Sequence, residues 1–134
     1  MFIRSKLRFS AVLFAGSVIA SSQVNAGNES RYEAFGLDSG LFEVIAEFTE
    51  DAIYWCGAGI FAQSRLSGSA TQRVYVWQGP SGSAAKPGQV AVTFGLTPPP
   101  SGKVSSLTTD VDIIGNSLSV AQAKQICDVR TASG

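Results

Sequence analysis

The two cysteines, Cys56 and Cys127, have the most distinctive chemistry in this chain. Because the N-terminus predicts export, as described below, an even number of cysteines favours a disulfide over two free thiols. The alternative is a reactive thiol at Cys56, but the chain has no Cys-X-X-Cys motif and no histidine to activate that thiol. We therefore expect a structural disulfide between Cys56 and Cys127.

The absence of histidine also excludes several classes of catalytic and metal site. Serine–histidine and cysteine–histidine nucleophile pairs cannot form, and no imidazole can act as a general base. First-row transition metals lose their commonest nitrogen ligand, and two cysteines alone cannot close a structural zinc site. The sequence therefore indicates no catalytic, cofactor-binding or metal-binding residues, and we expect a protein that is not an enzyme.

Four carboxylates lie close together in the sequence, at Glu43, Glu47, Glu50 and Asp51. They could form a catalytic pair or a calcium site. However, Glu43 and Glu47 fall on one face of a predicted strand roughly 13 Å apart, too far for glycosidase-type catalysis between them. Glu50 and Asp51 fit the first turn of a helix, where the helix dipole favours negative charge. We therefore expect an acidic face exposed to solvent.

Gly57 and Gly59 have the spacing of a phosphate-binding glycine loop. Such a loop follows a strand directly, whereas no predicted strand leads into Gly57, and the next acidic residue is as distant as Asp110. Each glycine costs about 1 kcal/mol of helix propensity relative to alanine, which indicates that another element packs closely against a helix here. The alternative is a helix that breaks near Gly57.

An aromatic pair, Tyr75 and Trp77, is the strongest candidate for a binding site. These residues alternate with Val74 and Val76 in a predicted strand, so the two pairs point to opposite sides of the sheet. If the valines face the core, Tyr75 and Trp77 form an aromatic patch with Ile45 on the open face, and such patches often mark binding surfaces. In the alternative, the N-terminal arm or a partner subunit covers them as core.

Hydrophobic periodicity predicts the elements that position these residues. They are, in chain order, a strand at 41–48, a helix at 50–65, strands at 73–78 and 89–96, a short strand at 111–114 and a helix at 120–130. Ser119 and Gln122 have the spacing of a capping box at the start of the last helix. The predicted fold is α+β: a small, mainly antiparallel sheet of three or four strands in the order β-α-β-β-(β)-α, with two helices packed on one face and tied by the disulfide.

The first 26 residues have the layout of a secretory signal peptide. Three basic residues precede an apolar run at 9–20, and Val-Asn-Ala at 24–26 supplies small residues at a cleavage site. The run is too short to span a membrane as a helix, and we expect no membrane span in the mature form. We divide the chain into a signal peptide (1–26), a flexible N-terminal arm (27–40) and a single domain (41–134), and expect a periplasmic or secreted protein.

The charge of the predicted mature chain limits its partners. After residue 26, seven lysines and arginines are opposed by ten aspartates and glutamates, and no basic run is present. Nucleic acids and anionic membrane surfaces are therefore poor partners.

One motif resembles a known group of proteins. The chain has Tyr-Trp-Cys-Gly-Ala at 54–58, Gly-Asn-Ser-Leu-Ser at 115–119, and then Cys127. This combination resembles uncharacterised small exported proteins of Rhodobacter- and Roseobacter-type alphaproteobacteria, over about residues 52–127. The resemblance implies the element boundaries and the cysteine pair, and it brings no active site with it.

Three functions are compatible with these features. We expect a small exported, non-catalytic binding or envelope-associated protein, whose partner is another protein or a small envelope ligand. The alternative is a secreted inhibitor of a foreign hydrolase, with the connection at 79–88 inserted into its target. A small enzyme with a carboxylate- or serine-based site is the least favoured function. A flat aromatic face would favour the first, a rigid protruding loop the second, and a deep polar pocket the third.

Overall fold

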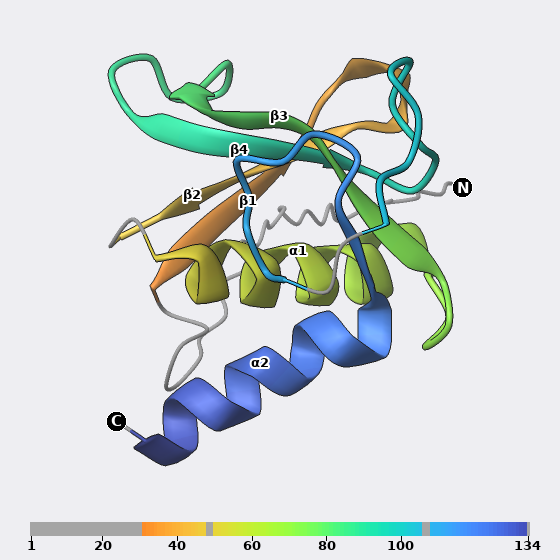
Figure 1. The fold of residues 1–134 in the computed structure, drawn as a ribbon. Coiled ribbons are helices and arrows are strands. Elements are labelled where there is room, and N and C mark those ends of the chain that lie inside the picture. Colours follow the sequence, from red (N-terminus) through yellow and green to blue (C-terminus); the bar gives the residue numbers. More distant parts are fainter. Residues whose placement is uncertain (1–30, 48–49, 106–107, 134) are drawn as a thin grey trace, which may run out of the picture.

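The computed structural model describes residues 31–47, 50–105 and 108–133 (Figure 1). The predicted signal peptide lies outside these residues. Five antiparallel strands form one sheet in the order β1-β2-β4-β3-β5. The strands are β1 (Tyr32–Gly36), β2 (Phe42–Ala46), β3 (Arg73–Gly82), β4 (Val90–Gly95) and β5 (Ser117–Ser119); the helices are α1 (Asp51–Leu66) and α2 (Val120–Ser133), with a short 3-10 helix, η2 (Asp38–Gly40), between β1 and β2.

The predicted α+β class is confirmed, and both helices lie on the same side of the sheet (Figure 1). The helices form successive layers: α1 packs directly on the sheet, and α2 packs on the far side of α1. The predicted capping box also forms at the start of α2. The backbone N–H of Ser119 donates to the Gln122 side chain at 2.9 Å, and the N–H of Gln122 donates to Oγ of Ser119 at 3.0 Å.

Two parts of the sheet differ from the sequence prediction. The segment 27–40, expected to be a loose arm, contains β1, which pairs with β2 at one edge of the sheet. The prediction of a short strand at 111–114 is wrong. These residues form turns, and the last strand is β5 at 117–119. The fully buried Asn116 fixes this arrangement, because its side-chain NH2 donates to the carbonyls of Thr108 and Asp110 and its oxygen accepts from Ser117 N.

The two helix glycines confirm close packing on α1 and show that the helix is not broken. A Cβ at position 57 would lie 2.8 Å from side-chain atoms of both Tyr32 and Val44, which belong to the sheet. A Cβ at position 59 would lie 2.7 Å from Cβ of Ala123 in α2. Each glycine therefore lets a different layer approach the backbone of α1, and the helix is buried on both sides.

Gly59→Ala tests this layering. Although alanine has the higher helix propensity, we expect the variant to lose about 2 kcal/mol of unfolding free energy, because the added methyl overpacks the contact with α2. Urea denaturation measures this loss, and Gly82→Ala is the matched control, since no atom lies within 4 Å of a Cβ there. A Gly59→Ala variant as stable as the wild type would contradict the close approach of α2.

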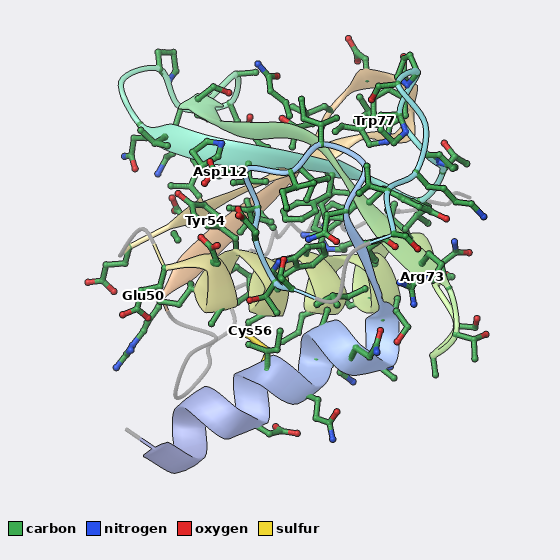
Figure 2. All side chains as sticks on the ribbon, in the orientation of Figure 1. Glu50, Tyr54, Cys56, Arg73, Trp77 and Asp112 are labelled. Atoms are coloured by element: carbon green, nitrogen blue, oxygen red, sulfur yellow. A yellow bond between two sulfur atoms is a disulfide. The ribbon has the colours of Figure 1, made fainter. Side chains whose placement is uncertain are left out.

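The predicted disulfide is present and joins the two helix layers (Figure 2). Cys56 of α1 and Cys127 of α2 are bonded, with their Cα atoms 5.0 Å apart and a separation of 71 in sequence. Both residues are buried. Among the described residues, neither helix is long and apolar enough to cross a bilayer.

Candidate functional site

The face of the sheet turned away from α1, here called the open face, carries the candidate binding residues. Val74 and Val76 are fully buried in the core, so Tyr75 and Trp77 point to the open face. Ile45 lies on the same face, because its neighbour Val44 belongs to the core. The structure therefore places all three candidates on the expected side of the sheet, and Figure 2 shows Trp77 on the side remote from the helices.

The burial of these residues differs from the patch that the sequence suggested. Tyr75 is only 9% exposed and Ile45 only 5%, so these two do not contribute to an exposed aromatic patch. Trp77 is the one member of the three that keeps a partly exposed side chain. The reason is that loops at the ends of the strands fold back over the open face, which strand periodicity alone does not reveal.

Trp77 is held in one orientation. Its Nε1–H donates to the carbonyl of Thr97 at 2.8 Å. The indole lies over Gly95, where a Cβ would come within 2.6 Å of Nε1 and within 2.8 Å of Cδ2 of Leu41. A residue larger than glycine at position 95 would therefore displace the ring. The indole therefore packs on the backbone of Gly95, and the hydrogen bond to Thr97 fixes the rotation of the ring.

Half-buried apolar side chains from β1 and the β1–β2 turn lie on the same face as the indole. Phe35 is paired with Glu43, an open-face position of β2. Leu41 reaches the space over Gly95 beside Trp77. We refer to Phe35, Leu41 and Trp77 as the Trp77 surface. It is apolar and partly exposed, with the pre-positioned indole as its largest group.

Glu43 corrects the expectation of a solvent-exposed acidic face. Its side chain is 2% exposed, and its carboxylate accepts hydrogen bonds from Oγ of Ser83 and, at 3.0 Å each, from the backbone N–H groups of Ala84 and Ala85. Burial acts to raise the pKa of this carboxyl, but the hydrogen bonds from Ser83, Ala85 and Ala84 together outweigh it and leave the pKa below its ordinary value. Glu43 is therefore a buried carboxylate that stays ionised at neutral pH.

Glu43 and Ser83 do not make a catalytic pair. The Ser83 hydroxyl donates to the carboxylate and accepts the backbone N–H of Lys86 at 2.8 Å, so its hydrogen-bonding capacity serves the turn. Ser83 is also buried, which keeps its oxygen from a substrate. A nucleophilic serine needs an oxygen that a substrate can reach, and the buried hydroxyl of Ser83 does not supply one.

A second group of carboxylates lies near the start of α1. The Asp51 carboxylate accepts the backbone N–H of Val111 at 3.4 Å; burial, followed by the charges of Asp110 and Asp112, raises its pKa. Burial, and then the charge of Asp51, also raises the pKa of Tyr54, whose buried hydroxyl has no hydrogen-bond partner among the described residues. Within the described ranges, no cluster of three or more Asp, Glu, His or Cys side chains could hold a metal ion.

An open pocket of about 440 Å³ lies at the edge of the sheet where β1 and β2 meet the β3–β4 hairpin. Its lining is mixed in charge and polarity and consists of Arg31, Tyr32, Glu33, Ile45, Ala46, Glu47 and Gln89. No sequence signal indicated this pocket, because its walls come from three separate segments.

No protein-family model, no curated protein and no solved structure matches this chain.

Proposed function

We propose that this chain is a non-catalytic binding protein that acts outside the cytoplasm and recognises another protein, or a small envelope ligand, through the Trp77 surface. The observation that carries the proposal is the state of Trp77: the indole is fixed by Gly95 and Thr97, yet it remains partly exposed. An aromatic side chain that is already ordered loses little entropy on binding and can act as an anchor.

The location outside the cytoplasm is part of the same proposal. The basic, apolar and small-residue pattern of residues 1–26 is typical of an export signal, and the Cys56–Cys127 disulfide suits an oxidising compartment. The resemblance to small exported alphaproteobacterial proteins points in the same direction. Periplasm and external medium are both compatible with these features.

One observation favours a second candidate, a secreted inhibitor of a foreign hydrolase. The tip of the β3–β4 hairpin exposes Ala84, Ala85, Pro87 and Gly88, while the Glu43 carboxylate fixes its backbone. An ordered loop with small exposed side chains is suited to insertion into a cleft. In this case the recognition residues would lie on the hairpin tip and not on the Trp77 surface.

Affinity capture separates the two candidates. We immobilise the chain beginning at Gly27 and incubate it with periplasmic and culture-medium fractions of the source cells. We expect Trp77→Ala to weaken retention of the partner by about 2 kcal/mol or more in binding free energy, as the loss of an aromatic anchor does.

The control is Val90→Ala, which truncates an exposed apolar residue that lies outside the Trp77 surface. This control should retain the partner like the wild type. If Trp77→Ala retains the same proteins with the same affinity and an Ala84→Arg change abolishes retention, the inhibitor is the correct function and the Trp77 surface is not the site.

A further inference from the structure

We propose that residues 83–89, the tip of the β3–β4 hairpin, form a strap that closes over the open face of the sheet, with the carboxylate of Glu43 as its latch. This inference does not depend on the proposed function. It follows from how the strap is held, from what lies beneath it and from what its own side chains bury.

The strap is held mainly by one side chain. Three of its groups, the Ser83 hydroxyl and the N–H groups of Ala84 and Ala85, donate to the Glu43 carboxylate, which projects from β2. β2 is separated from β3 by β4 in the sheet order, so the strap reaches across β4 to make these bonds. The Ser83 N–H to Gln89 O bond at 2.8 Å closes the base of the strap.

Most side chains of the strap are exposed, so the strap buries little apolar surface when it is closed. Ala84, Ala85, Pro87, Gly88 and Gln89 are all exposed. Segments with few buried apolar contacts open at low free energy unless a specific interaction holds them. Hydrogen bonds to an ionised group are about twice as strong as neutral ones, so the Glu43 bonds dominate the closed state.

The strap lies beside the mixed pocket. Gln89, its last residue, lines that pocket together with Ile45. Lys86 extends from the strap to Glu33 on β1, another lining residue, at 3.0 Å. Opening the strap would therefore remove one wall of the pocket, the wall that Gln89 supplies.

Among the described residues, the charged groups near the latch include one ion pair. β1 contributes Glu33, which is paired with Lys86 of the strap, while the β4 residue opposite Glu43 is the uncharged Thr93. The pKa of Glu43 is lowered in the folded state, so its carboxylate stabilises the closed strap at pH values above the ordinary glutamate pKa of about 4.3. This stabilisation is lost as the pH falls through the pKa that Glu43 has in the folded state. The strap should stay closed at neutral pH.

Amide hydrogen exchange on the whole chain tests the latch. Glu43→Gln preserves the size of the side chain but removes the charge and one acceptor oxygen. At pH 7 we expect the amides of Ala84 and Ala85 to exchange about tenfold faster or more than in the wild type, as the loss of charge-assisted hydrogen bonds predicts. The core amides of Val44 and Val92 should keep their protection relative to global unfolding.

The matched control is Glu33→Gln, which breaks only the exposed ion pair with Lys86 and should leave the Ala84 and Ala85 exchange rates within about threefold of wild type. If Glu43→Gln does not fold, Ser83→Ala removes one donor and should accelerate the same amides. Unchanged strap exchange in the folded latch variant, or in Ser83→Ala where that variant is needed, overturns the proposal. So does equal acceleration at Val44 and Val92, because that result reports global unfolding.

Discussion

We expect the double variant Cys56→Ala/Cys127→Ala to lose about 4 kcal/mol of unfolding free energy relative to the wild type. The disulfide joins positions 71 apart in sequence, so it closes a loop over most of the described chain and restricts the unfolded ensemble strongly. It also ties α2 to α1, and α2 makes most of its packing with that helix. Such a loss is a large fraction of the stability of a small domain.

Urea denaturation under oxidising conditions measures this change. The wild type in the presence of a strong reductant should lose a similar free energy, while the double variant should not respond to reductant. A double variant within about 1 kcal/mol of the wild type would show that helix packing, and not the covalent bond, holds α2 in place.

We expect the second large loss of stability when Trp55, the largest fully buried side chain, is truncated. Its ring packs against Phe94 of β4 with centroids 5.1 Å apart, and its Nε1–H donates to the carbonyl of Thr109 at 2.7 Å. Trp55→Ala should therefore lower the unfolding free energy by about 4 kcal/mol, because it leaves a large cavity between α1 and the sheet.

Trp55→Phe separates the contribution of the ring volume from that of the hydrogen bond to Thr109. Phenylalanine keeps an aromatic ring in the core but loses the bond to Thr109, so we expect a loss of about 2 kcal/mol, from a smaller cavity and the lost hydrogen bond. Circular dichroism during urea unfolding measures both variants. Equal effects of the two substitutions would show that the bond to Thr109 matters more than the volume of the ring.

Much of the fold could be predicted from local sequence patterns. The alternation around Val44, the helix glycines and the capping box at Ser119 each led to the correct element, since each depends on residues close in sequence. The disulfide followed from the cysteine count and the export signal.

The strands β1 and β5 could not be found in this way. β1 has a half-buried, mixed pattern in which Tyr32 and Ala34 pack on the core while Phe35 points to the open face, so its periodicity is weak. β5 has only three residues, and it is a strand because Arg73–Tyr75 pairs with it. The partner of β5 is therefore distant in sequence, whereas β1 pairs with β2, which follows it after a short turn.

For the candidate site too, local sequence predicts some features, and segments elsewhere in the chain decide the others. Strand alternation gave the correct face for Tyr75, Trp77 and Ile45, but their burial depends on loops that cross that face. The loop at 83–85 also explains why the Glu43 side chain is buried. An isolated carboxylate in a strand is expected to face water, and only the donors at 83–85 make its burial possible.

The central claim is that Trp77 is available for recognition and is not a structural equivalent of Trp55. Thermal unfolding of Trp77→Ala tests it most directly. Because the indole is only half-buried and makes one hydrogen bond, we predict a loss of at most about 2 kcal/mol, with a Tm shift under about 15 °C and a native circular dichroism spectrum. A loss as large as that of Trp55→Ala would contradict the claim, because it would place Trp77 in the core and leave the open face without an anchor.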